Sequence, residues 1–330
     1  MGSPTPCRCL LRLLPLVVPL IEAYALPTLR ARPTRAPRMS LPASPLPPPP
    51  TPPPEARGAL VASMDEAALA LGEAAHALGE APPRRAPPPR GPDGRLLPVL
   101  TLPGDSLDDT PIMPALLALS SLLAFAAVGR AFACGAGPLA PLLGVALGGL
   151  AGELLSGAFH WATDNYGSLR TPVVGFACAA FQGHHLAPWT ISYRSAANNV
   201  HKIGAAALAP TVGALLWLPP VPAAFVATLL YSQLLAQEFH RWTHTPPHLL
   251  AAWQRGLQDA GIALGVNEHV AHHKPPFDKH YCILTGRLNA FLDEKPVLFW
   301  RRLEALVYRI NGQEPNSWKD PRVKEVALRL

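Results

Sequence analysis

The histidines of this chain are unevenly placed, and their spacing suits metal coordination. All of them except His76 follow residue 159. Two motifs place a pair of side chains four residues apart, which puts both on one face of a helix. Two others hold adjacent histidines. The four groups are His160 with Asp164, His184 with His185, His240 with His244, and His269 with His272 and His273.

Imidazole is a suitable ligand for iron, zinc, copper and nickel. A single pair of histidines four residues apart is usually two unrelated side chains. Four groups in one half of a chain point instead to a metal centre, and eight imidazoles with one carboxylate are enough for two metal ions. The five cysteines contain no C-x-x-C pair, so the sequence does not indicate a thiolate site or a disulfide framework.

Three further residues are weaker candidates for the same centre. Glu153 lies inside an apolar run, where an ionisable group is by default a functional hypothesis. The alternative for Glu153 is a carboxylate that reaches the membrane interface or a polar neighbour. Asn199 and His201 belong to an Asn-Asn-x-His pattern that follows the His184–His185 pair.

Other classes of protein fit the pattern less well. A zinc protease would need H-E-x-x-H, whereas Glu268 here precedes the first histidine of its group. A metal transporter would carry ionisable ligands in the middle of its spans. The net charge of +6 comes without a basic stripe of interleaved aromatic residues, so we expect no nucleic-acid partner.

The chain is 49% hydrophobic and 15% charged, well below the roughly 25% charged residues of a soluble domain. Four apolar runs cover residues 112–128, 139–159, 203–218 and 221–236. The first two are close to the roughly 20 residues that cross a bilayer, and the last two are shorter. We therefore predict a mainly α, polytopic membrane protein with about four transmembrane helices in two hairpins and a histidine-rich helical cap on one membrane face.

The order of these runs predicts on which side the histidines lie. The third and fourth runs leave and return, so the segment 160–202 and the chain from residue 237 onward share one side. These segments hold every histidine except His76 and most of the lysines and arginines of the body. By the positive-inside rule this face is cytoplasmic or, in a plastid, stromal.

Residues 1–54 are rich in arginine and contain one acidic residue, which is typical of a transit peptide. The sequence Ala23-Tyr24-Ala25 resembles a signal-peptidase site, so a signal followed by a transit peptide is an alternative. Residues 55–105 form a Pro/Ala-rich linker that we expect to be mostly disordered.

Several motifs together resemble one family of lipid desaturases. This family contains the chloroplast desaturase that makes trans-Δ3-hexadecenoic acid on phosphatidylglycerol, and the plasmanylethanolamine desaturases that make the plasmalogen vinyl ether. The motifs are Gly157-Ala-Phe-His160-Trp-x-x-Asp164-Asn-Tyr-Gly167, Phe181-Gln-Gly-His-His185, Pro188-Trp-Thr-Ile191, Asn198-Asn199-x-His201, Glu238-Phe-His-x-Trp-x-His244, His269-x-x-His-His273 and Tyr281-Cys-Ile-x-x-Gly286.

The resemblance implies a lipid desaturase domain over residues 106–318, followed by a tail at 319–330. It implies two iron ions, O2 as co-substrate, a membrane lipid as substrate, and an electron donor that is ferredoxin in a plastid or cytochrome b5 in the endoplasmic reticulum. Asp164 would be a ligand or would orient one. The implied metal set is His160, Asp164, His184, His185, His240, His244, His269, His272 and His273, with His201 belonging to the chloroplast-type pattern.

Two branches of the family remain open on the sequence. Gln182-Gly183, the Asn-Asn-x-His pattern and the leader resemble the chloroplast branch, whereas Phe299-Trp-Arg-Arg-Leu-Glu304 resembles the plasmalogen branch. We expect a chloroplast membrane enzyme that introduces a trans-Δ3 bond into palmitate on phosphatidylglycerol. The alternatives are a plasmanylethanolamine desaturase of the endoplasmic reticulum, a lipid hydroxylase, and a non-catalytic membrane metal-binding protein. Residues 297–310 are expected to form an amphipathic helix at the membrane interface.

Overall fold

The structure is a computed structural model that describes residues 89–134 and 137–330. The predictions for the leader, for most of the linker and for His76 lie outside these residues. The described part is helical and contains no β-strand, which confirms the mainly α class.

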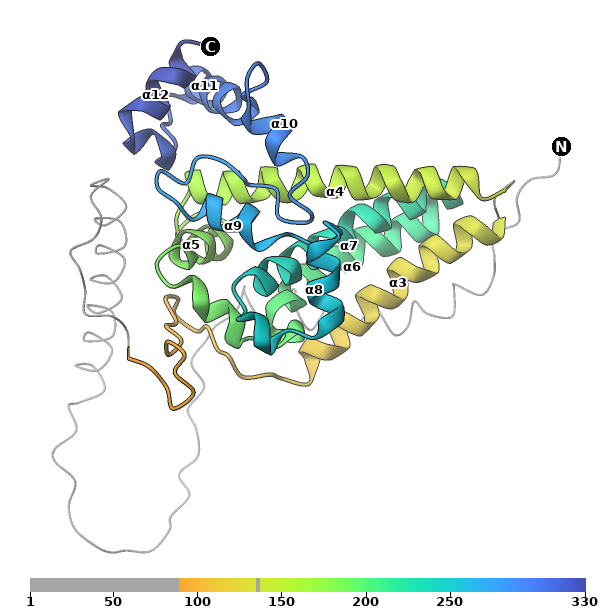
Figure 1. The fold of residues 1–330 in the computed structure, drawn as a ribbon. Helices are drawn as coiled ribbons and strands as arrows, with labels where there is room; N and C mark the ends of the chain where they lie inside the picture. Colours follow the sequence, from red (N-terminus) through yellow and green to blue (C-terminus); the bar gives the residue numbers. More distant parts are fainter. Residues whose placement is uncertain (1–88, 135–136) are drawn as a thin grey trace, which may run out of the picture. The chain divides into compact units, whose positions relative to one another are not determined.

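Four long helices form the body of this part of the chain, and they are α3 (Ile112–Cys134), α4 (Leu139–Asn165), α6 (Ala196–Trp217) and α7 (Pro220–Thr243). Figure 1 shows them side by side, with α7 in contact with each of the other three. By length and composition α3, α4 and α6 are able to span a membrane. The second half of α7 carries Gln233, Gln237 and Glu238, which lower its mean hydropathy, so the predicted count of four spans is not confirmed.

Small residues let α4 and α7 approach closely. Gly144, Gly148 and Gly152 recur every fourth residue and so share one face of α4. A Cβ atom on Gly148 would lie 2.6 Å from the carbonyl oxygen of Phe225, and one on Gly152 would lie 2.5 Å from the Cβ of Ser232. This glycine face therefore works as small residues do between membrane helices, where they allow backbones to meet.

Large apolar side chains of α3 and α4 point outward instead. Phe125 is 66% exposed and Leu139 is 78% exposed, and Leu142, Leu143, Leu147 and Leu150 are also exposed. The buried residues of α4 are mainly glycine and polar residues. Apolar surface outside and small or polar residues inside is the arrangement expected when lipid is the solvent.

Shorter helices form a cap at the end of the bundle where α4 ends and α6 begins (Figure 1). They include α5 (Gly175–His184), the 3-10 helix η3 (Pro188–Tyr193), η4 (Pro247–Leu249), α8 (Ala252–Asp259) and α9 (Val266–His272). α5 contacts α4, and α9 contacts α7. The cap thus joins the two helices that carry the His160 and His240 motifs.

The C-terminal helices gather around one buried carboxylate. They are α10 (Asn289–Asp293), α11 (Phe299–Asn311), η5 (Asn316–Lys319) and α12 (Pro321–Leu328). Glu304 of α11 is fully buried and accepts hydrogen bonds from Arg301, from the Ser317 hydroxyl at 2.9 Å and from the Trp318 indole at 2.9 Å. The segment predicted as a tail thus includes a helix, α12, with buried Val323 and Ala327.

α11 has an exposed apolar edge, as a helix at a membrane interface would have. Leu306 and Ile310 are exposed, whereas Trp300 and Glu304 on the other side are buried. Its place at an interface stays a prediction.

The segment 95–109, which we call the strap, lies along the cap. The Val99 amide donates to the Thr190 hydroxyl at 2.9 Å, and the Trp189 indole donates to the Leu97 carbonyl at 2.9 Å. The Tyr193 hydroxyl donates to the Leu96 carbonyl at 2.8 Å. The predicted linker ended at residue 105, and its last ten residues are thus bonded to the cap.

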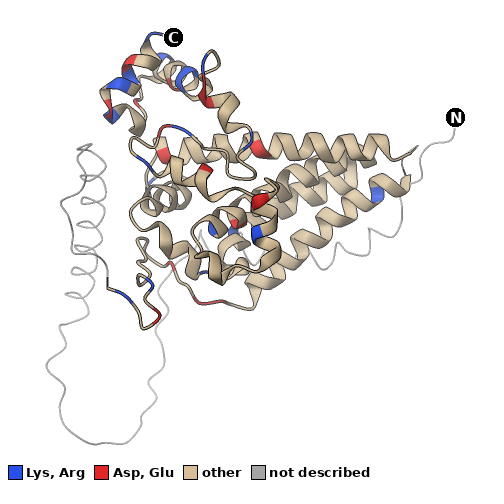
Figure 2. Cartoon of the chain, in the orientation of Figure 1, with Lys and Arg blue, Asp and Glu red and all other residues tan. Residues whose placement is uncertain are grey.

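Charged side chains are concentrated at the cap and in the C-terminal helices (Figure 2). At the opposite end of the bundle Arg130 donates to the carbonyls of Leu215 and Leu218, where α6 ends. Arg194 and Lys202 lie instead at the start of α6, and Arg241 lies in the last turn of α7, at the cap end. This asymmetry is the one that the positive-inside rule uses.

Candidate metal centre

Five imidazoles meet at one point of the cap. Their ligating nitrogens all lie within 4.8 Å of one another. The closest pairs of Nε2 atoms are separated by 2.9–3.2 Å. We call this set the five-histidine group, and its members are His184, His240, His244, His269 and His273.

A second group lies beside the first and contains the carboxylate. Its donor atoms also lie within 4.8 Å of one another. Oδ2 of Asp164 is 3.2 Å from Nε2 of His160, 3.4 Å from Nε2 of His185 and 3.3 Å from Nε2 of His272. This histidine–aspartate group comprises His160, Asp164, His185 and His272.

The adjacent histidines of each doublet serve different groups. His184 belongs to the five-histidine group and His185 to the other, and His273 and His272 divide in the same way. Successive residues of a helix point about 100° apart, so neighbours cannot share one centre easily. The two groups are in contact as a result, with the ring centroids of His185 and His273 5.0 Å apart.

Backbone carbonyls orient two rings of the histidine–aspartate group. Nδ1 of His160 lies 3.0 Å from the Tyr281 carbonyl oxygen, and Nδ1 of His272 lies 2.8 Å from that of Lys279. A carbonyl only accepts, so each Nδ1 carries the proton and each Nε2 presents a lone pair. Both lone pairs face Asp164, and a carbonyl behind a metal-ligating histidine is a recurrent arrangement.

This donor set fits a cation. Neither carboxylate oxygen of the buried Asp164 has a hydrogen-bond partner, and Nε2 of His160 has none. A buried carboxylate facing bare lone pairs is strongly unfavourable without a positive charge between them. Imidazole nitrogens bind zinc at about 2.0–2.1 Å, and two such ligands at right angles lie about 3.0 Å apart, close to the separations in the five-histidine group.

The imidazoles outside the long helices are held neutral. Burial lowers the pKa of His184 and His269 well below the usual value, and neighbouring histidines lower it further. Burial likewise lowers the pKa of His244 to about 3, and it lowers that of His273. Metal binding requires deprotonated imidazole, so these four side chains are ready to coordinate at neutral pH.

The three weaker candidates lie outside both groups. Glu153 accepts hydrogen bonds from the amides of Thr285 and Gly286 at 2.7 and 2.8 Å, and so fixes a turn on α4. Asn199 donates to the Gln237 carbonyl and to Glu238, which ties α6 to α7.

His201 donates a hydrogen bond within its own helix, from Nδ1 to the Asn198 carbonyl oxygen 2.8 Å away. Because a carbonyl only accepts, Nδ1 carries the proton. Two histidines that match no motif are also outside the groups: His248 is exposed, and Nδ1 of His280 lies 3.0 Å from a carboxylate oxygen of Glu268.

The profile of the lipid desaturase domain matches residues 150–318, which include all nine members of the two groups. The chain belongs to the lipid desaturase domain family. This family membership agrees with the resemblance of the histidine motifs, and the profile begins within α4 and ends in η5.

Individual members of the lipid desaturase family show the same relationship. Fatty acid desaturase 4, chloroplastic, of Arabidopsis thaliana is 42% identical over 182 residues, 53% of this chain and 55% of the relative. Fatty acid desaturase 4-like 1, chloroplastic, of the same plant is 38% identical over 56% of this chain and 62% of its own length. Plasmanylethanolamine desaturase 1 of Mus musculus is 32% identical over 53% of this chain and 68% of its own length.

The chain thus spans little more than half the length of the chloroplastic relatives it matches. No solved structure matches it.

The groups that orient the rings were not predicted from the sequence. The carbonyls of Lys279 and Tyr281 belong to the backbone, so no residue type marks them. The Tyr281 side chain had a signal, because it heads the motif that follows the last histidine group. Its hydroxyl accepts from Asn165 at 2.9 Å and donates to the Phe277 carbonyl at 2.7 Å, which braces the segment behind His272.

Proposed function

We propose that this protein is an O2-dependent lipid desaturase whose two adjacent ligand groups each hold one iron ion. The observation that carries the proposal is the meeting of nine donor residues in two touching groups at one end of a bundle of apolar helices. Family membership supports the same reaction class.

Two bound iron ions would supply the oxidising power that no side chain has, which removing hydrogen from an unactivated methylene requires. The chain's own residues would hold the ions and orient the imidazole ligands. The carbonyls of Lys279 and Tyr281 turn His272 and His160 toward Asp164, and the buried cap keeps water from the centre. In the overall balance, CH2–CH2, O2, two electrons and two protons give CH=CH and two water molecules.

For the substrate we favour palmitate esterified to phosphatidylglycerol, with a trans double bond at Δ3. The chloroplastic names of the relatives at 42% and 38% identity support it, together with the motif Gln182-Gly183 and the Asn198-Asn199-x-His201 pattern. In this setting ferredoxin would donate the electrons.

A plasmanylethanolamine desaturase is the second candidate. It is supported by the 32% identity to the mouse enzyme of that name, 68% of whose length is matched. That function would place the chain in the endoplasmic reticulum, with cytochrome b5 as electron donor.

The proposed location is a chloroplast membrane, with the histidine face toward the stroma. The names of the chloroplastic relatives and the concentration of lysine and arginine at the cap end support it. Residues 1–54 would be the targeting leader and residues 106–318 the desaturase domain.

The test is expression of the full chain, with a plastid ferredoxin system, in a host that makes neither lipid product. Total lipids are then analysed for trans-3-hexadecenoate on phosphatidylglycerol and for acid-labile vinyl ethers. We expect the trans-3 acyl chain, its loss in His272→Ala, and its retention in His248→Ala, which changes an exposed histidine outside both groups.

Other products would point elsewhere. A vinyl ether would select the second candidate, and a hydroxylated lipid would make the protein a hydroxylase. A membrane-inserted chain that binds a metal without O2-dependent turnover would be a metal-binding protein.

A further inference from the structure

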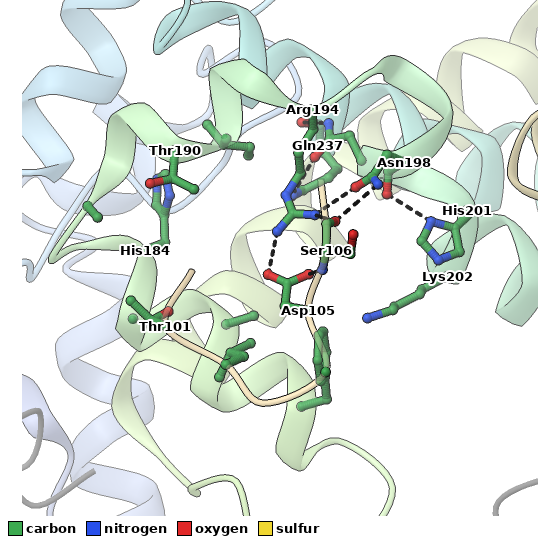
Figure 3. Close-up of a pocket in the computed structure, with 18 of the residues that line it drawn as sticks. Thr101, Asp105, Ser106, His184, Thr190, Arg194, Asn198, His201, Lys202 and Gln237 are labelled. Atoms are coloured by element: carbon green, nitrogen blue, oxygen red, sulfur yellow. Dashed lines mark hydrogen bonds and ion pairs between the residues drawn. The ribbon is translucent and has the colours of Figure 1, made fainter. Parts of the chain in front are cut away.

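A cavity of about 250 Å³ lies between the strap and the cap (Figure 3). One wall is the strap, including Thr101, Asp105 and Ser106, and the others come from α5, η3 and the first turns of α6. The strap precedes residue 150, where the family profile begins. The cavity therefore combines family elements with a wall that belongs to the N-terminal part of this chain.

The cavity touches the metal centre at one point. His184 lines it and is also a member of the five-histidine group. Apolar side chains of Leu102, Met113 and Phe176 line the same space. A ligand with one polar end and an apolar remainder would therefore be accommodated next to the reacting centre.

Two cationic side chains line the cavity, and one of them already forms an ion pair within the protein. Arg194 forms an ion pair with Asp105 and donates to Asn198 at 2.6 Å and to the Ser106 carbonyl at 3.0 Å (Figure 3). This network clamps the strap to the start of α6. The one carboxylate among the lining residues is thereby neutralised.

The second cation, Lys202, is placed differently. Its ammonium lies 3.3 Å from the centroid of the Phe176 ring and has no ion-pair partner among the described residues. A cation over an aromatic face is held in place but keeps its charge. Figure 3 shows the side chain extending from α6 into the space beside Asp105.

We propose that this cavity binds the phosphate of an anionic lipid head group, with Lys202 as the ion-pairing residue. The inference rests on the proposed function for the role of the bound lipid, since it places the polar end of the substrate beside His184. Thr101 and His201, which also line the cavity, complete the polar end. The Thr101 hydroxyl is able to donate to the phosphate, whereas His201, whose Nδ1 carries the proton, is able only to accept from a head-group hydroxyl at Nε2.

The charges of the cavity also distinguish between head groups. A phosphatidylglycerol head carries one negative charge and no positive one. An ethanolamine head adds an ammonium, which would meet Lys202 and find the Asp105 carboxylate already paired with Arg194. Removing a charge from water without a partner is costly, so the cavity favours the anionic lipid.

The test measures binding without turnover, using the full chain with its metal, purified in detergent. The probes are dioctanoyl phosphatidylglycerol, dioctanoyl phosphatidylethanolamine and sn-glycerol 3-phosphate, with Kd from calorimetric titration. We expect phosphatidylglycerol to bind about 10-fold more tightly than either other probe. Lys202→Met should weaken its binding about 10-fold, or about 1.4 kcal/mol, and Lys202→Arg should preserve it.

The matched control is Lys295→Met, which removes an exposed lysine outside the cavity and should leave the Kd unchanged. Metal content and melting temperature of each variant check that the fold is intact. The proposal is overturned by a Lys202→Met protein that binds phosphatidylglycerol as tightly as the wild type, or by equal binding of the ethanolamine lipid. Glycerol 3-phosphate that binds as tightly as the lipid would overturn the lipid as the source of the phosphate.

This result is separable from the proposed function. Head-group binding that depends on Lys202, without alkene formation, would leave the site standing and remove the desaturase. Alkene formation by Lys202→Met with an unchanged KM would support the desaturase and remove the head-group site.

Discussion

The orientation of single imidazole rings sets what the two ligand groups can do. In the histidine–aspartate group, two Nδ1 atoms are bound to carbonyls 2.8 and 3.0 Å away, and so two Nε2 lone pairs converge on Asp164. In the five-histidine group the Nε2 atoms converge on one another instead. The first group would thus bring a negative charge to a bound metal ion, and the second would bring only neutral donors.

We expect His272→Ala to reduce bound iron from about two ions per chain to one or fewer. The substitution removes one of four donors and leaves Asp164 facing fewer lone pairs. Iron is measured by mass spectrometry of the purified protein, with His248→Ala as the control. Two ions retained in His272→Ala would contradict the assignment of this group.

The sequence singled out the nine residues that the structure brings together, but it did not show how they divide between two groups, and their role as metal ligands stays a prediction. The nine residue types and their spacing were enough to name the set. Their allocation depends on the rotation of α5 and α9 about their axes, which packing decides, so the splitting of each doublet could not be read from spacing. Glu153 was a candidate ligand by sequence but has a structural role, which could not be predicted because its two amide partners are more than 130 residues away in the chain.

At the scale of elements, the close approach of α4 to α7 brings together helices that contribute to different ligand groups. α4 carries His160 and Asp164, and α7 carries His240. The glycine face of α4 allows this approach, since a Cβ on Gly148 would lie within 2.6 Å of a backbone carbonyl oxygen that cannot move away as a side chain could.

We predict that Gly148→Ala destabilises the protein by about 1–3 kcal/mol, the usual cost of overpacking, and reduces its iron content. Gly149→Ala is the matched control, because a Cβ there meets nothing within 4 Å. Melting temperature and metal content are measured for both variants. Equal behaviour of the two would show that the close approach is unimportant.

The helices themselves were largely predictable, and their ends were less so. The apolar run at 139–159 corresponds to α4, which continues to Asn165 and carries Asp164. α6 begins at Ala196, well before its apolar run at 203, because Ser195 caps a polar first turn by accepting from the Asn198 amide. The strap was not predicted, since its bonds are to residues about 90 positions away.

Glu304 ties the C-terminal helices to α4, because its carboxylate also lies 3.4 Å from the Trp161 indole nitrogen. We expect Glu304→Gln to destabilise the protein by about 3 kcal/mol, the lower end for a broken buried pair, since the buried Arg301 loses its nearer partner and keeps only Asp278, 3.6 Å away. Glu325→Gln removes an exposed pair with Arg329 and should change the stability little. Thermal unfolding of both variants provides the comparison, and similar melting temperatures would contradict the role of Glu304.

At the scale of the whole molecule, the described chain has two unlike ends. The two ligand groups, the strap and most lysines and arginines lie at the cap end, whereas α3 ends, at Cys134, at the opposite end of the bundle (Figure 1). A hydrocarbon substrate dissolved in the bilayer would meet the centre only at its boundary, where the long helices emerge.

We predict that Cys134 and a cysteine introduced by Lys274→Cys label from opposite sides of a sealed membrane. A membrane-impermeant maleimide added to oriented vesicles should modify one and spare the other until detergent is added. Cys7, Cys9, Cys178 and Cys282 are replaced by serine in both variants, and Cys134 is also replaced in the Lys274→Cys variant, so that each has a single thiol. Labelling of both from one side would contradict a membrane crossing by α4, which connects the end of α3 to the cap.

The carbonyls behind His160 and His272 have a genetic consequence. Every residue type except proline and glycine presents the same carbonyl group in much the same way, so point mutations at Lys279 and Tyr281 change side chains but leave the acceptors in place. Substitutions that displace these carbonyls are instead expected at residues whose side chains hold the loop in shape. His280, between the two carbonyls, has a φ of 59° and donates its amide to Asp293 at 2.9 Å. Screens for inactive variants should therefore find lesions at Asp293 and at the buried Tyr281, whose side chain braces the loop, and miss the exposed Lys279, of which only the backbone carbonyl faces His272.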